Sequence, residues 1–214
     1  MRRALVVHGG WDGHEPLAST TIFADWLATQ DFEVVRSDTL DSYADAALMG
    51  SVDLIVQCVT MSKISKEQWQ GLNAAVSAGV GLAGWHGGLC DSFREHTEYQ
   101  FMTGGQWVAH PGGIIDYRVD VTAWDDPITA GITGFHMQSE QYYMHTDPGN
   151  RVLATTTFTG EHAPLAAGTV MPQVWKRRWG KGKVFYSALG HVAKDFNVPE
   201  ARTIMQRGLL WAAR

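Results

Sequence analysis

The 214-residue sequence has few cysteines, no excess of basic residues and no long apolar run. Two cysteines, Cys58 and Cys90, are too few for a disulfide framework and are typical of a reducing compartment. The formal net charge of −5 speaks against a nucleic-acid partner, because phosphate binding needs clustered Lys and Arg. No stretch approaches the roughly 20 apolar residues of a membrane helix, and the N-terminus shows no signal-peptide pattern. We therefore expect a cytoplasmic protein that does not engage a membrane.

Short apolar runs alternate with helical patterns in the first half of the chain, which is typical of a parallel sheet covered by helices. The length suits a single domain over residues 1–214. The first four strands are expected at Arg3–Val7, Phe32–Arg36, Val52–Cys58 and Val80–Ala83. Later runs at 171–178 and 183–189 flank Gly180-Lys181-Gly182 and predict an added β-hairpin. The sequence thus predicts an α/β fold with a doubly wound, mostly parallel sheet.

A glycine-bracketed histidine follows the fourth predicted strand, in the segment Gly84–Gly88. The pattern has the form of a nucleophile elbow, in which glycines permit a sharp strand-to-helix turn and expose the middle side chain. The middle residue is His86. Histidine can act as acid, base or metal ligand, but it is a poor replacement for Ser or Cys in acyl transfer. Cys90 is expected to be a packing residue, so a cysteine-dependent amidase or protease is disfavoured.

Two more histidines follow apolar strands beside glycine. His8 ends the first predicted strand, and His191 follows the last one through Gly190. Ligands of open α/β sheets bind outside the carboxyl ends of the strands, so His8, His86 and His191 are expected to meet there. Glu140 lies among Gln and Tyr residues and is the best carboxylate candidate. Four other histidines carry no signal beyond composition: His14, His96, His136 and His162.

This set of residues is compatible with two chemistries. Histidines beside a glutamate can act as general acids and bases, with their pKa values adjusted by burial and by neighbours. Alternatively, His8, His86 and His191 can bind a divalent metal such as zinc and leave a position open for water or a sugar oxygen. Both chemistries remain open at this stage.

A series of short motifs extends over nearly the whole chain: Gly84–Gly88, His110-Pro111, Asp126–Ile128, Ser139–Tyr142, Pro172–Trp175, Gly180–Tyr186 and Leu189–His191. Their order and spacing resemble the ThuA-like (trehalose utilisation) family. The resemblance implies the flavodoxin-like fold of class I glutamine amidotransferases, with His86 where those enzymes keep a catalytic cysteine. It also implies catabolism of trehalose and related sugars, including 3-keto derivatives. The family's acidic motif is often Asp-Glu-x-Tyr, whereas Ser139 precedes Glu140 here.

From these features we expect a sugar-catabolism enzyme, an isomerase, lyase or hydrolase rather than an amidotransferase. His86, His191 and Glu140 are the expected catalytic residues. Four neighbours of the motif residues are expected to contact the sugar: Trp85, Trp107, His110 and Tyr142. The alternative is a non-catalytic sugar-binding or regulatory protein that keeps the fold without the nucleophile. A small-molecule sugar is the expected partner in both cases, and a homo-oligomer is compatible with the sequence.

Overall fold

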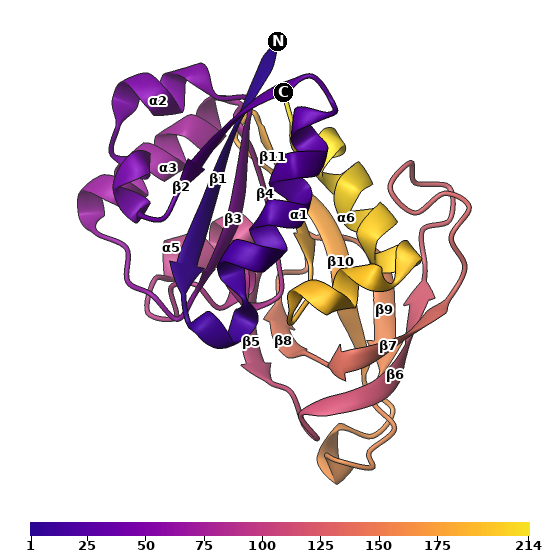
Figure 1. The fold of residues 1–214 in the computed structure, drawn as a ribbon. Coiled ribbons are helices and arrows are strands. Elements are labelled where there is room, and N and C mark those ends of the chain that lie inside the picture. Colours follow the sequence, from indigo (N-terminus) through magenta and orange to yellow (C-terminus); the bar gives the residue numbers. More distant parts are fainter.

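A computed structural model describes residues 1–214 and contains a nine-stranded sheet in the order β2-β1-β3-β4-β11-β10-β9-β6-β7 (Figure 1). A separate two-stranded sheet pairs β5 with β8. The strands are β1 (Arg2–Gly10), β2 (Phe32–Ser37), β3 (Leu54–Thr60), β4 (Gly81–Trp85), β5 (Gly105–Ala109), β6 (Ile114–Val121), β7 (Phe135–Glu140), β8 (Tyr143–Thr146), β9 (Arg151–Thr157), β10 (Val170–Trp179) and β11 (Gly182–Ser187).

The large sheet has a parallel part and an antiparallel part. Strands β2, β1, β3, β4 and β11 run parallel to one another. The order β2-β1-β3-β4 is that of flavodoxin-like doubly wound folds, so the expected fold class is confirmed. Strands β10, β9, β6 and β7 continue the sheet in antiparallel pairs.

Strands β10 and β11 pair in antiparallel register on either side of Gly180 and Lys181. Strand β11 also pairs in parallel with β4, with Ser187 opposite Trp85. This hairpin therefore lies inside the large sheet and joins its two parts. The pairing brings the chain that follows β11 beside the segment that follows β4.

Helices cover both faces of the sheet (Figure 1). They are α1 (Pro16–Ala28), α2 (Ala46–Ser51), α3 (Lys66–Ala78), α4 (Gly87–Cys90), α5 (Thr97–Thr103) and α6 (Pro199–Ala212), with 3-10 turns η1 (Asp12–His14), η2 (Leu40–Tyr43), η3 (Pro164–Ala166) and η4 (Ala193–Asn197). Side chains of β1 alternate between two cores, because successive residues of a strand point to opposite faces. Ala4 and Val6 join the core beneath α1 and α6, whereas Leu5 and Val7 join the core beneath α3.

Two segments between β4 and β6 are held by specific contacts. Helix α5 begins at Thr97, because the His96 side chain accepts a hydrogen bond from the Tyr99 backbone and caps the helix there. The segment around Trp107 is strand β5, which pairs with β8. This pairing holds the backbone that carries Trp107.

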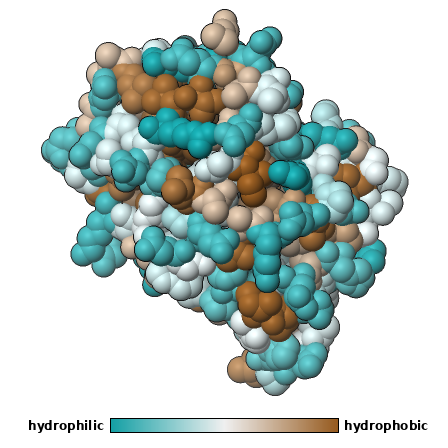
Figure 2. Space-filling model, in the orientation of Figure 1, coloured by the Kyte–Doolittle hydropathy of each residue, from teal (hydrophilic) through white to brown (hydrophobic).

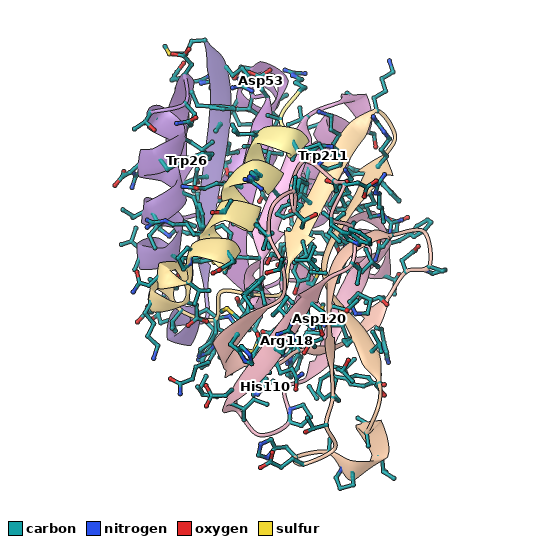
Figure 3. All side chains as sticks on the ribbon, turned by 90° about the vertical axis from the view of Figure 1, so that its right-hand side faces the viewer. Trp26, Asp53, His110, Arg118, Asp120 and Trp211 are labelled. Atoms are coloured by element: carbon teal, nitrogen blue, oxygen red, sulfur yellow. The ribbon has the colours of Figure 1, made fainter.

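The surface in the view of Figure 2 is mostly hydrophilic and carries separate hydrophobic patches. None of the helices combines the length and the apolar composition that crossing a membrane requires. In Figure 3, Asp53, which immediately precedes β3, lies at the opposite end of the molecule from His110. His110 therefore marks the end at which β3 and the other parallel strands finish.

Two helical glycines permit a test of the packing between α6 and the sheet. A Cβ atom at Gly208 would lie 2.1 Å from a ring carbon of the buried Phe185, whereas a Cβ at Gly50 would meet nothing within 4 Å. We expect Gly208→Ala to lower the free energy of unfolding by about 1–3 kcal/mol through overpacking. Gly50→Ala should raise it by up to about 1 kcal/mol through helix propensity. Urea unfolding measures both, and equal stability of the two variants would contradict the close packing.

Candidate functional site

Four polar side chains meet at the carboxyl edge of the sheet. They are His14 on η1, His86 directly after β4, Glu140 at the end of β7 and His191 after β11. One potential ligand atom from each lies within 4.8 Å of the corresponding atoms of the other three. We call this group the His–Glu cluster. The expectation that His86, His191 and Glu140 come together thus agrees with the structure.

The backbone at His86 has the sharp turn of an elbow. Its φ of 49° and ψ of −142° lie in a region that non-glycine residues rarely adopt, at a cost of about 1–3 kcal/mol. Helix α4 begins at the next residue. A Cβ atom at Gly87 would lie 2.5 Å from His14 Cε1, and one at Gly88 would lie 2.7 Å from Cys58 Cα. The two glycines therefore allow the turn to approach η1 and β3 closely.

The hydrogen bonds of the buried His86 ring determine its tautomer. Nδ1 lies 2.9 Å from the backbone oxygen of Ala188 and must donate, because a carbonyl oxygen only accepts. Nε2 lies 3.0 Å from Glu140 Oε2. The ring also stacks on Tyr142, with ring centroids 3.8 Å apart. A neutral His86 therefore directs the lone pair of Nε2 at a carboxylate oxygen.

Glu140 lies between three histidines. Besides His86, His191 Nδ1 lies 3.3 Å from Oε2, and His110 Nε2 lies 3.6 Å from Oε1. Burial alone would raise the pKa of Glu140, but the neighbouring ring nitrogen of His191 outweighs burial and holds this pKa well below its usual range. Glu140 is therefore a carboxylate at neutral pH.

Two histidines of the cluster, His14 and His86, have lowered pKa values. Burial, and then the proximity of His86 and His191, lowers the pKa of His14 from 6.5 to about 3. Burial likewise lowers the pKa of His86. His14 Nδ1 lies 2.8 Å from Thr60 Oγ1, which leaves Nε2 as its nitrogen for a further ligand. Neutral imidazoles beside an ionised carboxylate are the protonation states that a divalent metal requires of its ligands.

His8 does not join the cluster, which corrects the expected metal set. Strand β1 extends to Gly10, so His8 lies within the strand, opposite Cys58, rather than at its end. It lines a separate hollow together with Asp38 and Gln68. The chain instead brings His14 to the cluster. The only sequence signal for His14 is its place in the loop between β1 and the helix that starts at Pro16, because such loops line the carboxyl edge.

Trp85 is not a sugar platform, which corrects a second expectation. Its side chain is 1% exposed and packs against Phe23 and Phe196, at ring-centroid distances of 5.0 and 5.6 Å. Its position in β4 directs it into the core beneath α1 and α6. Another indole does lie beside the cluster: Trp11 is 47% exposed and contacts His14 edge-on at 4.8 Å.

The other expected sugar contacts do lie beside the cluster. The ring centroid of His110 lies 5.7 Å from that of Trp107 and 6.2 Å from that of Tyr142. Trp107 lies on β5, His110 directly follows that strand, and Tyr142 lies between β7 and β8. The strand β5, which the sequence did not predict, thus positions the indole and the imidazole.

Asp195 is a site-supporting residue that the sequence interpretation missed. Ser139 Oγ donates to Asp195 Oδ2 at 2.5 Å, and the backbone N–H of His191 donates to the same oxygen at 3.0 Å. This buried carboxylate on η4 therefore ties the end of β7 to the loop that carries His191. Ser139 thus binds an acid supplied from another element.

Both cysteines are buried and unsuited to nucleophilic catalysis. Burial raises the pKa of Cys58 to about 12 and also raises the pKa of Cys90. The thiolate is the nucleophilic form of cysteine, and it is suppressed at both positions. The elbow therefore presents His86 without a reactive thiol nearby.

Comparisons with known proteins agree with this architecture. The family model for ThuA, described as trehalose utilisation, matches residues 3–212. A ThuA-like protein from Bacteroides uniformis ATCC 8492 superposes with a TM-score of 0.80 at 15% identity, over 99% of this chain and 91% of its own. One from Parabacteroides merdae ATCC 43184 gives 0.80 at 17%, over 99% and 89%.

A more distant structure shares the fold as part of a larger chain. A beta-galactosidase from Bacillus circulans sp. alkalophilus gives a TM-score of 0.61 at 13% identity, over 99% of this chain and 30% of its own. At such identities the similarity concerns the fold alone. No curated protein matches the sequence.

The lowered pKa of His14 predicts an acid-sensitive stability. Below pH 6.5 the unfolded chain binds a proton at this residue, whereas the folded chain does not until about pH 3. The contribution of His14 to the free energy of unfolding is therefore fully present above pH 6.5 and is lost as the pH falls from 6.5 towards 3. Between pH 7 and 5, with chelator present, His14→Gln should lose about 2 kcal/mol less unfolding free energy than the unaltered chain. The exposed His136→Gln is the control, and identical pH slopes for all three proteins would contradict the prediction.

Proposed function

The chain belongs to the ThuA (trehalose utilisation) family, and we propose that it is a sugar-catabolism enzyme that acts on trehalose-related or 3-keto-glycoside substrates. The observation that carries this proposal is the His–Glu cluster at the carboxyl edge of the sheet, where ligands of doubly wound folds bind. Its chemistry is acid–base catalysis assisted by a divalent metal ion.

The proposed metal ligands are His14, His86, Glu140 and His191. Three imidazoles and a carboxylate form a donor set that zinc and similar first-row ions accept. The contact between His86 Nε2 and Glu140 Oε2, at 3.0 Å, is an argument for a metal ion at this position. With Nδ1 donating to Ala188, Nε2 directs a lone pair at the carboxylate oxygen, and a cation held by His86 and Glu140 would make this contact attractive. Thr60 and Ala188 would act as outer partners that orient the His14 and His86 rings.

When bound, the ion would polarise a substrate carbonyl oxygen as a Lewis acid. On a 3-keto glycoside, a base then takes the proton from C2. In elimination, the C2–H electrons form a C1=C2 double bond, the bond from C1 to the glycosidic oxygen breaks, and that oxygen takes up a proton. In isomerisation, C3 takes up a proton, the proton of the C2 hydroxyl group is transferred to the oxygen on C3, and the carbonyl moves to C2. Both reactions need the same base and the same polarised ketone.

His110 is the side chain best placed to move the proton. It is 36% exposed, and its Nε2 lies 3.6 Å from Glu140 Oε1, so it contacts both the cluster and the outside. His86 is 1% exposed and is better suited to hold Glu140 and the ion than to reach a substrate carbon. Glycoside hydrolysis usually employs two carboxylates, and the cluster has Glu140 alone. We therefore favour lyase or isomerase chemistry over hydrolysis.

Metal content distinguishes the proposed ligand set from the one expected from sequence. The unaltered chain, purified without chelator, should carry one divalent ion, and His14→Ala should lose it because one of four ligands is gone. His8→Ala is the matched control and should keep a full complement. Elemental analysis by mass spectrometry measures all three. If His8→Ala lost the ion and His14→Ala retained it, the proposed ligand set would be refuted.

Activity on an authentic 3-keto glycoside tests the enzyme assignment. Glu140→Gln should lower kcat/KM about 10²- to 10⁴-fold, because a neutral amide can replace the carboxylate neither as a metal ligand nor as the partner of His110, the group that moves the proton. His86→Ala should abolish turnover with little change in circular dichroism. The exposed His136→Ala, on the same strand as Glu140, should keep full activity. Full activity of His86→Ala would refute the assignment. Sugar binding without product under any metal supplementation would instead support the non-catalytic sugar-binding alternative.

A further inference from the structure

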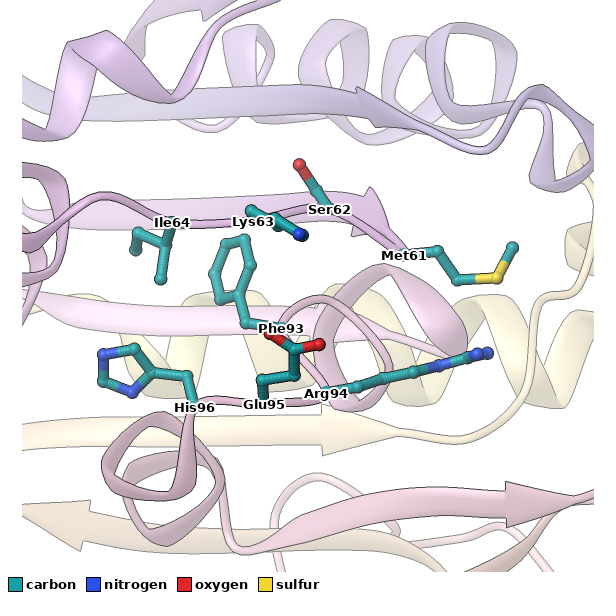
Figure 4. Close-up of a pocket in the computed structure, with 8 residues that line it drawn as sticks. All are labelled: Met61, Ser62, Lys63, Ile64, Phe93, Arg94, Glu95 and His96. Atoms are coloured by element: carbon teal, nitrogen blue, oxygen red, sulfur yellow. The ribbon is translucent and has the colours of Figure 1, made fainter.

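A groove of about 430 Å³ lies beside the His–Glu cluster, between residues 61–64 and 93–96 (Figure 4). This volume falls within the range of small-molecule sites, about 300–1,000 Å³. Two backbone hydrogen bonds hold its walls together: Met61 N donates to Asp91 O, and Ser62 N donates to Ser92 O, each at 2.8 Å. The buried Phe93 lies between the walls. The groove is therefore a built feature of the fold.

One end of the groove leads to residues that flank the His–Glu cluster. In Figure 4, Met61 and Arg94 lie together at this end of the groove. Met61 directly follows Thr60, the last residue of β3, whose Oγ1 lies 2.8 Å from His14 Nδ1. This wall of the groove is therefore one residue removed in sequence from a side chain that contacts the cluster.

The opposite wall connects to the cluster through aromatic side chains. The Arg94 guanidinium lies over the Trp107 ring, 4.8 Å from its centroid. The buried Asp91 holds it in a bidentate contact, with both N–O distances 2.7 Å. Trp107 in turn packs beside His110, which contacts Glu140. Arg94 is thus a fixed hydrogen-bond donor at the junction of groove and cluster.

The lining combines the groups that bind a neutral, hydroxylated ring. Phe93, Met61 and Ile64 offer apolar surface, and Ser62 offers a hydroxyl group. Lys63 and Glu95 carry opposite charges, while Asp91 compensates Arg94, so the groove has no excess of positive charge for a phosphate. Hydroxyl groups can both donate and accept hydrogen bonds, and so they can pair with a cation and an anion at once.

We propose that this groove binds the second sugar unit of a disaccharide whose first unit lies at the His–Glu cluster. The proposal rests on the proposed function for the identity of that first unit. The groove would make the protein selective for a disaccharide over a monosaccharide glycoside. Lys63 and Glu95 are the specificity-determining residues, because they alone offer uncompensated charges to the second ring.

Calorimetric titration with two probes, α,α-trehalose and methyl α-D-glucopyranoside, tests the proposal. The unaltered chain should bind trehalose at least tenfold more tightly. The double variant Lys63→Ala/Glu95→Ala should weaken trehalose binding about tenfold, the equivalent of one charged hydrogen bond, and should leave the affinity for the monosaccharide unchanged. The matched control is Lys66→Ala/Glu67→Ala, an exposed pair of the same charges in the first turn of α3, and it should change neither affinity.

The outcomes separate this proposal from the proposed function. Equal affinity of the unaltered chain for the two probes would overturn the groove as a sugar site, and the proposed function would stand. If the double variant bound both sugars more weakly, or bound neither of them more weakly, the groove proposal would be overturned in the same way. Binding of neither probe to the unaltered chain would overturn the sugar assignment and the groove proposal together.

Discussion

The contact between His86 and Glu140 joins the two parts of the large sheet. His86 follows β4 in the parallel part, and Glu140 ends β7, the far edge strand of the antiparallel part. For these side chains to lie 3.0 Å apart, the antiparallel strands must curl back towards the carboxyl edge of the parallel ones. Asp195 reinforces this arrangement because it binds both Ser139 and the backbone of His191. The geometry of the site therefore depends directly on the curvature of the sheet.

Electrostatic effects determine the protonation states of the side chains around this contact. Burial removes the cationic form of His14 and His86, and the neighbouring ring nitrogen of His191 keeps Glu140 ionised despite its burial. Each group is thus held in the protonation state that leaves lone pairs directed into a common space. The strained backbone of His86 belongs to the same arrangement, since it is the conformation in which the ring contacts Glu140.

The sequence predicts the parallel part of the fold well because its signals are local. Apolar runs such as 54–56 are buried on both faces, and Ser65 with Gln68 forms a capping box at the start of α3. The elbow is also local, since the glycines around His86 permit the sharp turn that a residue with a Cβ atom would obstruct. These features need no knowledge of distant contacts.

Other parts of the site depend on contacts that no local pattern encodes. The choice of His14 over His8 depends on where β1 ends, and pairing with β3 through Gly10 and Thr60 determines that end. Trp85 was misplaced because alternation along β4 directs it away from the edge. Strand β5 exists because β8 pairs with it, and Asp195 reaches Ser139 across 56 residues of sequence. Each of these features depends on contacts between residues that are far apart in the sequence.

The wide spread of the His–Glu cluster along the chain has a kinetic consequence. Its members come from η1, β4, β7 and the loop after β11, so the cluster exists only when nearly the whole chain has folded. A group that binds all four side chains therefore recognises the native state and not partly folded chains. Such a ligand would leave the folding rate almost unchanged and act mainly by slowing unfolding. Occupancy of the site would then set the lifetime of the folded molecule as well as its chemistry.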